Sequence, residues 1–405
     1  MKKSKKMIVV IATLDTKSSE AKYLKDLISE RGHTPIVIDV GIFGKHSFDP
    51  DFNHEAVAEA AGSSVQDVQN CKGEGEAISI MARGASKIVN KQADEGRVDG
   101  LVSIGGSMGT SLGLAVMQSL PVKIPKLMLS SIAFTPMVTP GSVSIDQVMM
   151  QTIGDLWGLN RITKMALQRA AGAICGMVEA QKEEEKEEKG IIAITTLGVH
   201  SYVDYCKPLL LEKGYEPVVF HAVGTNACEK LVRDGYLKGL LDLAIYELVN
   251  FVCGGAISGG EEKIKAACEK GIPQVIAPGA LDFFTWTGTI DSLPLKFQKR
   301  NIHMHNPLVL LVQTSSKEKQ EIARLIVERV NKTKGPTVLL VPLKGFSSLD
   351  TLGKPFYDPE AGKKFAGVMH KGITNNLVEI VELNLHINDP LFGERAAQLL
   401  LDKMQ

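Results

Sequence analysis

Residues 7–14, Met-Ile-Val-Val-Ile-Ala-Thr-Leu, have a close counterpart at residues 190–197, Gly-Ile-Ile-Ala-Ile-Thr-Thr-Leu. Both runs are mostly apolar, as expected of strands buried on both faces of a parallel sheet. The likeness continues downstream, where Arg31-Gly-His-Thr-Pro35 and Lys213-Gly-Tyr-Glu-Pro217 each lead into a run of β-branched and aromatic residues. A strand–helix–strand unit that recurs at domain-sized spacing predicts two similar domains.

Strand and helix patterns alternate on both sides of these runs. In the first half, the patterns predict strands at 7–12, 35–40, 100–104 and 126–130, and helices at 18–31, 53–70, 74–95 and 112–120. Residues 145–189 read as largely helical, with an interruption at Gly158. In the second half we expect strands at 190–195, 217–221, 239–243, 274–277, 308–313 and 337–342, and helices at 201–213, 226–237, up to 269, 316–333 and 360–383.

This alternation predicts an α/β protein made of two Rossmann-like domains with mostly parallel sheets, related by an internal repeat. The charged run Lys-Glu-Glu-Glu-Lys-Glu-Glu-Lys at residues 182–189 is typical of a solvated helix end or linker. We therefore expect a nucleotide-binding domain at residues 1–185 and a second domain, with a C-terminal helical tail, at residues 186–405.

Composition narrows the functional classes. The 405 residues include 46 basic and 46 acidic ones, so no nucleic-acid partner is expected. No apolar stretch approaches the roughly 20 residues that span a bilayer, so no membrane partner is expected either. The six cysteines lack CxxC spacing, which favours buried thiols in a reducing cytoplasm.

Candidate ligand-binding residues follow three predicted strands of the first half. In open α/β sheets, ligands bind outside the carboxyl ends of the strands. The segments there are 13–17, 39–41 and the glycine-rich loop 105–111, and the candidates are Thr13, Leu14, Asp15, Thr16, Lys17, Asp39, Gly41, Gly105, Gly106, Ser107, Gly109, Thr110 and Ser111.

Each of these groups also has a purely structural interpretation. The 105–111 loop is neither a Walker A motif nor a strict Gly-x-Gly-x-x-Gly. It either binds phosphate at a helix N-terminus or forms only a tight strand–helix turn. Lys17 is either a phosphate ligand or a solvated lysine. Asp15 would hold a ribose hydroxyl or Mg²⁺, or cap a helix. Asp39 would bind a ribose hydroxyl or shape a turn.

The repeat serves as an internal control. Where the first copy has Asp15-Thr16-Lys17, the second has Gly198-Val199-His200, and His221 aligns with Asp39. The glycine-rich loop has no close counterpart. The sequence therefore predicts a nucleotide site in the first copy alone, with the second copy forming a wall of a cleft between the domains.

Three further motifs carry weaker signals. His303-x-His305 would place two imidazoles on one face of a strand, but no third ligand is evident and no metal site is assigned. Ser347 lacks the Gly-x-Ser-x-Gly elbow of a catalytic serine. Arg161, after a Trp-Gly break, suits an anion or a carboxylate partner equally.

These stretches together resemble a known family, the uncharacterised bacterial and plant family typified by the N-terminal ATP-binding domain of the tomato mosaic virus resistance protein. The resemblance spans essentially the whole chain and rests on Ala12–Lys17, Ile38–Gly41, Gly105–Thr110, Ile124–Met128, Gly158–Ile162, Gly271–Val275, Pro278–Asp282 and Pro342–Ser347. It implies two Rossmann-like domains, ATP binding and a homodimer. The chain departs from the family pattern at Ser18-Ser19, where Gly-Glu is expected, and at Gln313, near which an Arg is expected.

We therefore expect a cytoplasmic protein that binds ATP, with or without Mg²⁺, and that has room for a second small-molecule substrate in the cleft. The reaction and its catalytic residues stay unassigned, as does whether the protein is an enzyme. One alternative is a lyase or hydrolase that acts on a carboxylate or phosphate metabolite without ATP turnover. Another is a non-enzymatic module that binds a partner.

Overall fold

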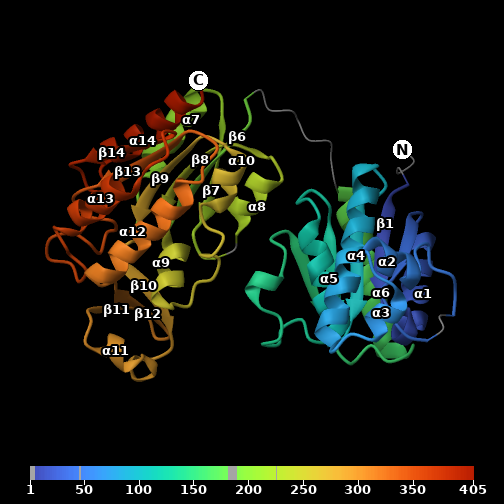
Figure 1. Ribbon diagram of the computed structural model, residues 1–405. Coiled ribbons are helices and arrows are strands. Elements are labelled where there is room, and N and C mark those ends of the chain that lie inside the picture. The colour runs from blue at the N-terminus through green and yellow to red at the C-terminus, as the bar shows by residue number, and fades with distance from the viewer. Residues whose placement is uncertain (1–4, 45–46, 181–188, 225) are drawn as a thin grey trace. The chain divides into compact units, whose positions relative to one another are not determined.

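The computed structural model describes residues 5–44, 47–180, 189–224 and 226–405 (Figure 1). The chain divides into two compact units, residues 1–184 and 185–405. The predicted boundary, between residues 185 and 186, lies outside the described residues. Each unit is described by itself below.

The first unit is built on a five-stranded parallel sheet with strand order β2-β1-β3-β4-β5. Its strands are β1 (Met7–Ala12), β2 (Thr34–Asp39), β3 (Gly100–Gly105), β4 (Lys126–Ser130) and β5 (Gln147–Gln151). Its helices are α1 (Leu14–Glu30), α2 (His54–Ala60), α3 (Val65–Gln69), α4 (Glu74–Asp94), α5 (Ser107–Ser119), α6 (Arg161–Ala180) and the 3-10 turn η1 (Pro140–Ser142).

Alternate residues of β1 explain why its sequence is apolar throughout. Ile8 and Val10 belong to the core that α1 and α6 form on one face of the sheet. Val9 and Ile11 belong to the core that α2, α4 and α5 form on the other face. All four side chains are at most 1% exposed, and burying each contributes about 1.5–3 kcal/mol relative to solvent.

The second unit has a six-stranded parallel sheet of order β14-β13-β9-β8-β6-β7 and a separate antiparallel sheet of order β10-β12-β11. Its strands are β6 (Ile191–Thr196), β7 (Glu216–His221), β8 (Leu237–Ala244), β9 (Gln274–Gly279), β10 (Phe283–Thr287), β11 (Ile302–Asn306), β12 (Val309–Gln313), β13 (Thr337–Pro342) and β14 (Val378–Leu383). Its helices are α7 (Val203–Glu212), α8 (Ala227–Arg233), α9 (Tyr246–Cys253), α10 (Lys265–Lys270), α11 (Leu295–Gln298), α12 (Ser316–Val330), α13 (Ala361–Gly372), α14 (Pro390–Lys403) and the 3-10 turn η2 (Ile290–Ser292). Helices α7 and α14 cover one face of the large sheet, and α8, α10, α12 and α13 cover the other (Figure 1).

The internal repeat is visible in the topology. In each unit the first strand lies between the second and third, as β1 lies between β2 and β3, and β6 between β7 and β8. The register repeats as well, because Ile8 pairs with Pro35 and Ile192 pairs with Pro217. The predicted fold class, two Rossmann-like α/β domains with mostly parallel sheets, is confirmed.

Three predicted elements were wrong. Residues 147–151 form the edge strand β5 instead of a helix, and residues 107–111 are the first turn of α5 instead of a loop. Residues 378–383 form β14, although the prediction extended a helix to 383. Three of the six residues in Val-Glu-Ile-Val-Glu-Leu are β-branched, and parallel pairing of the whole segment with β13 overrides the helical tendency of its glutamates.

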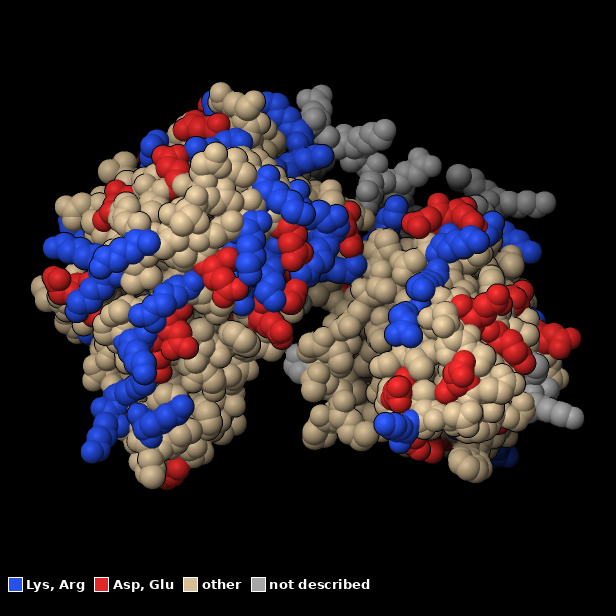
Figure 2. All heavy atoms as spheres, viewed as in Figure 1, with Lys and Arg blue, Asp and Glu red and all other residues tan. Residues whose placement is uncertain are grey.

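Charged side chains do not segregate by sign on the visible face of either unit. Acidic groups lie among basic ones on both units, and broad areas carry neither (Figure 2). In the described part of the chain, no helix is both long and apolar enough to cross a membrane.

Candidate functional site

The first unit contains a cavity of about 670 Å³, which we name the first-unit cavity. It opens where β1, β2, β3 and β4 end, and so lies at the point between β1 and β3 where the strand order reverses. Its walls are Thr13, Asp15, Thr16, Lys17, Val40, Gly41, Ile42, Phe43, Glu74, Ala77, Ile78, Met81, Gly106, Ser107, Met108, Gly109, Leu112, Ser131, Ile132, Met137, Asp155 and Trp157.

The structure brings together most of the predicted site residues. Those that line the cavity are Thr13, Asp15, Thr16, Lys17, Gly41, Gly106, Ser107 and Gly109. Those that do not are Leu14, Asp39, Gly105, Thr110 and Ser111. Several residues of the second group hold the wall residues in place through hydrogen bonds or close packing.

Asp39 ties two strand ends together. Its Oδ1 accepts hydrogen bonds from the backbone N–H groups of Leu14 and Gly41, each at 2.9 Å. Its Oδ2 lies 3.0 Å from His54 Nδ1, and the residue is 1% exposed. This geometry matches the turn-shaping alternative, because both carboxylate oxygens already have partners within the first unit and the residue does not line the cavity.

Asp15 plays a related part on the cavity wall. Its Oδ2 accepts hydrogen bonds from the backbone N–H groups of Ile42 and Phe43, both at 3.1 Å. Gly41 makes this approach possible, because a Cβ at that position would lie 2.8 Å from Asp15 Cγ. The carboxylate therefore holds the 41–43 segment in place at one side of the cavity.

Lys17 is a cation without an acidic partner. The residue is 8% exposed, and its Nζ lies 5.4 Å from the centre of the Trp157 ring. Within the described part of the chain, no ion pair joins this ammonium to a carboxylate. Its backbone departs from helical geometry (φ −125°, ψ 22°), so α1 is kinked where this side chain meets the cavity.

The N-terminus of α5 faces the same cavity. Gly106 is its N-cap and supplies no side-chain cap, and the first turn carries no acidic residue. The backbone N–H groups of such a turn have no partner within the helix and give it a partial positive charge. Gly105 allows this turn to approach β3, because a Cβ there would lie 2.7 Å from Gly109 Cα. Thr110 is buried, and its hydroxyl lies 2.6 Å from Ser130 Oγ.

The cavity also has apolar walls, which the sequence did not identify. They include Ile42, Ala77, Ile78, Met81 and Leu112. The α4 residues among them belong to an amphipathic pattern, and in the sequence such a face is indistinguishable from ordinary core. The Trp-Gly break at 157–158 was the one visible sign of the loop that adds Asp155 and Trp157 to the wall.

The corresponding crevice of the second unit is nearly closed. The ends of β6 and β7 border a space of about 10 Å³, which is room for about one water molecule. Lys263 fills the crevice, with its Nζ 2.9 Å from Asp242, 3.3 Å from Glu247 and 3.7 Å from Glu229. We name these four residues the Lys263 cluster.

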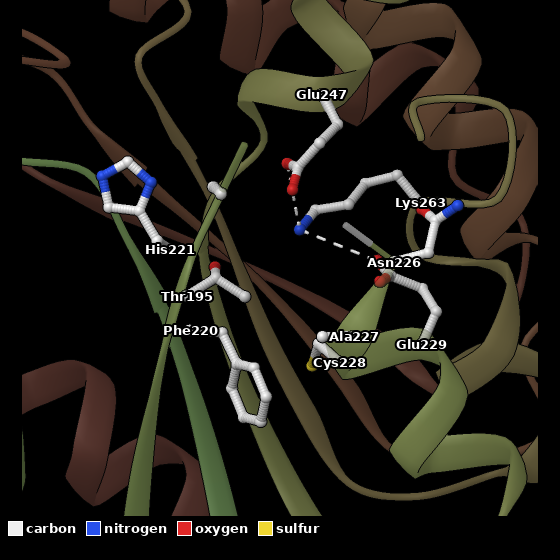
Figure 3. Close-up of a pocket in the computed structure, with 10 residues that line it drawn as sticks. Thr195, Phe220, His221, Asn226, Ala227, Cys228, Glu229, Glu247 and Lys263 are labelled. Carbon is white, nitrogen blue, oxygen red and sulfur yellow. Dashed lines mark ion pairs between the residues drawn. The ribbon is translucent and has the colours of Figure 1, made fainter. Parts of the chain in front are cut away.

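Figure 3 shows three members of the Lys263 cluster, Lys263, Glu229 and Glu247. Dashed lines join the ammonium to Glu247 and Glu229, while the His221 imidazole points away from it. Burial alone lowers the pKa of Lys263, but its three carboxylate neighbours outweigh this effect and raise the pKa well above its ordinary value. The lysine is therefore a fixed cation and not a nucleophilic amine.

Comparison with known proteins assigns the chain to a family. The model of the Uncharacterised protein family (UPF0261) N-terminal domain matches residues 6–183, and that of its C-terminal domain matches residues 189–404. The chain belongs to the UPF0261 family.

Relatives of this UPF0261 protein occur in bacteria and in a plant. A UPF0261 protein of Clostridium tetani is 39% identical over 99% of both chains, and one of Brucella suis is 34% identical over 96% of this chain and 93% of its own. The tomato (Solanum lycopersicum) ToMV resistance protein Tm-1(GCR237) is 35% identical over 81% of this chain and 44% of its own length. A solved arginase from Bacillus caldovelox aligns over 91% of this chain and 97% of its own at 12% identity, with a TM-score of 0.19, too low to carry an argument.

The remaining sequence candidates of this UPF0261 protein do not form a site in the described residues. His303 and His305 lie on β11, and no group of three or more His, Cys, Asp or Glu side chains there is arranged to hold a metal ion. Ser347 is fully buried and donates a 2.6 Å hydrogen bond to Asp282. Gln313 lies on β12, and its amide contacts Asn301 and the backbone of Phe356.

Proposed function

We propose that the first unit binds ATP in the first-unit cavity. The observation that carries the proposal is Lys17, a cation that is 8% exposed, has no carboxylate partner among the described residues and lines the same cavity as the uncapped N-terminus of α5. A charge that has lost most of its hydration needs a partner of opposite sign. We call the part of the wall formed by Lys17 and the first turn of α5 the polar end of the cavity. It therefore suits a phosphate chain.

Two kinds of donor support phosphate there. The first-turn N–H groups of α5 form an anion site of the kind used by many nucleotide-binding folds, and Ser107 adds a hydroxyl. The ammonium of Lys17 supplies the full positive charge. We expect the polyphosphate to lie between these two groups.

The apolar wall residues support a base and its sugar. Ile42, Ile78, Met81 and Leu112 offer surfaces against which a flat heteroaromatic ring can lie. A volume of about 670 Å³ falls within the roughly 300–1,000 Å³ typical of sites for ligands of this size. A small carboxylate or phosphate metabolite would contact Lys17 and the first turn of α5 and leave these apolar walls uncovered.

Isothermal titration tests the proposal. The titrants are ATP, adenosine, inorganic pyrophosphate and citrate, and the proteins are the wild type, Lys17→Met and Lys22→Met. Lys22 is the matched control, because it lies on the same helix but forms an exposed pair with Asp26. We expect ATP to bind the wild type and Lys22→Met equally, and to bind Lys17→Met roughly 10- to 100-fold more weakly, the loss of a hydrogen bond to a charged group.

Two results would contradict the proposal. If ATP produces no binding heat with the wild type, the cavity is not a nucleotide site. If citrate or pyrophosphate binds as tightly as ATP, the apolar wall residues contribute nothing to affinity, and the alternative of a small-anion lyase or hydrolase gains support.

A further inference from the structure

Trp157 combines high exposure with a fixed position. Its side chain is 81% exposed, yet it lines the first-unit cavity beside Lys17. The next residue on one side, Leu156, is fully buried in the core beneath α1 and α6. The next on the other side, Gly158, donates a 2.6 Å hydrogen bond from its backbone to Glu20 on α1. The indole is therefore presented to solvent from a loop that is anchored on both sides.

The anchoring residue and the lysine belong to the same short stretch of helix. Glu20 is 1% exposed, and its second oxygen accepts a 2.7 Å hydrogen bond from the Ser19 hydroxyl. It lies one helical turn beyond Lys17, where the backbone of α1 is kinked. The loop and the lysine are thus connected through α1, which places the indole ring 5.4 Å from the ammonium.

This contact leaves the ammonium free to bind an anion. A lysine ammonium carries three N–H donors, and an aromatic face satisfies only the side turned toward it. The flexible lysine stem would otherwise sample many rotamers, and a ring at 5.4 Å restricts that choice. Restricting the free state lowers the entropy lost when a ligand binds.

We propose that Trp157 is a positioning residue for the phosphate chain of the ligand: its indole face holds the Lys17 ammonium at the polar end of the first-unit cavity. This inference rests on the proposed function and adds a second residue to the phosphate end. It specifies a ligand that carries phosphate, because a ligand without that charge gains nothing from the placement of Lys17.

The test compares Trp157→Leu and Trp157→Phe with the wild type by titration with ATP and with adenosine. A cation–ring contact predicts that Trp157→Leu binds ATP roughly 2- to 5-fold more weakly, that Trp157→Phe recovers part of the loss and that adenosine affinity does not change. A purely structural role for the indole would weaken both ligands together. Equal ATP affinity in wild type and Trp157→Leu, or a matching loss for adenosine, would overturn the inference while the ATP site itself stands.

Fluorescence gives a readout that is independent of affinity. The chain has two tryptophans, so Trp286→Phe leaves Trp157 as the single reporter. In that background we expect ATP to change the emission of Trp157. We expect Lys17→Met to change the emission of the free protein and to move the response to ATP to roughly 10- to 100-fold higher concentration. Emission that is insensitive to Lys17→Met would show that the contact does not persist in solution and would overturn the inference. If the wild type fails to bind ATP at all, the proposed function falls first and this inference falls with it.

Discussion

Two neighbouring glycines in the first unit have different roles. Gly105 is required by packing, since a side chain there would collide with the backbone of Gly109. Gly106 is under no such constraint, because the nearest atom to an added Cβ is Ser131 Oγ at 3.8 Å. Gly106 can therefore be replaced to probe the anion site without disturbing the fold.

Replacing Gly106 should separate stability from binding. Asp at an N-cap accepts hydrogen bonds from the first turn and interacts favourably with the helix dipole, so Gly106→Asp should stabilise the unit slightly, by less than about 1 kcal/mol. The same carboxylate would occupy the phosphate position and repel the ligand. We expect unchanged or higher denaturation midpoints together with loss of ATP binding.

Gly106→Asn is the control for that experiment. Its amide caps the helix in the same way but carries no charge. It should weaken ATP binding less than Gly106→Asp does. Equal ATP affinity in the wild type and Gly106→Asp would place the phosphate elsewhere.

At the scale of elements, the Lys263 cluster joins β8, α9, α8 and the segment before α10. Arg329 on α12 secures that segment, because its guanidinium donates hydrogen bonds of 2.8 and 2.7 Å to the carbonyl groups of Gly260 and Lys263. Ile264 has a positive φ of 75°, which is strained for a β-branched residue and persists because its surroundings determine it. The cluster closes the crevice that the first unit keeps open.

Lys263→Met should therefore destabilise the second unit. Removing the cation leaves three buried carboxylates without compensation, a change that typically costs about 3–5 kcal/mol. The partly exposed Lys265, which pairs with Glu262, provides the control, and Lys265→Met should cost less than about 1 kcal/mol. Urea unfolding, followed by Trp286 fluorescence in a Trp157→Phe background, measures both. Equal midpoints for the two variants would show that the buried pairs contribute nothing.

Loops after β9 and β13 should make the stability of the second unit depend on pH. Burial raises the pKa of Asp282 to about 6, and burial together with the Asp282 charge raises that of Asp350 to about 7. Raised carboxyl pKa values mean that the folded state holds these protons more tightly, so their contribution to stability is present in full below about pH 4, falls as the pH rises, and is lost once the pH passes about 6 to 7. Burial lowers the pKa of His200 to about 4 and also lowers that of His386, so their contribution is lost as the pH falls below about 6.5.

The two trends oppose each other between about pH 4 and 6.5, so variants are needed to separate them. Asp350→Asn removes one of the titrating carboxyls, so the free energy of unfolding of this variant should rise relative to that of the wild type between pH 5 and 7 and stay parallel to it above pH 7. Asp291→Asn, at an exposed position, should show no such change. The measurement is urea unfolding across pH 5 to 8 with the Trp286 signal, and the same pH dependence in the wild type and Asp350→Asn would contradict the assignment.

The sequence was sufficient to predict the parallel sheets and the polar residues that line the first-unit cavity. The apolar strands and the groups after them, such as Lys17 and Gly106, follow from local pattern and from the rule that ligands bind at strand ends. The apolar walls of the cavity were not predictable. Ile78 and Met81 line the cavity from α4, and the spacing of apolar residues in this helix is the same as that of a helix packed against a core. The Lys263 cluster was not predictable either, because its members come from separate elements and meet only through tertiary packing.

At the scale of the whole molecule, the two copies of the repeated fold differ in the space they leave at the strand ends. Both units reverse strand order at the same place, but the first leaves a cavity of about 670 Å³ there and the second about 10 Å³. The charged groups that line the two spaces differ as well. In the first unit, Lys17 lacks a carboxylate partner among the described residues, whereas in the second Lys263 is surrounded by three.

We propose one nucleotide site for each chain, in the first unit. The most direct measurement is a crystal structure of the full chain grown with a non-hydrolysable ATP analogue. We predict one analogue for each chain, with its phosphates within hydrogen-bond distance of Lys17 Nζ and the first-turn N–H groups of α5, and a second-unit crevice still filled by Lys263. An empty first-unit cavity, or an analogue bound at the strand ends of the second unit, would contradict the account.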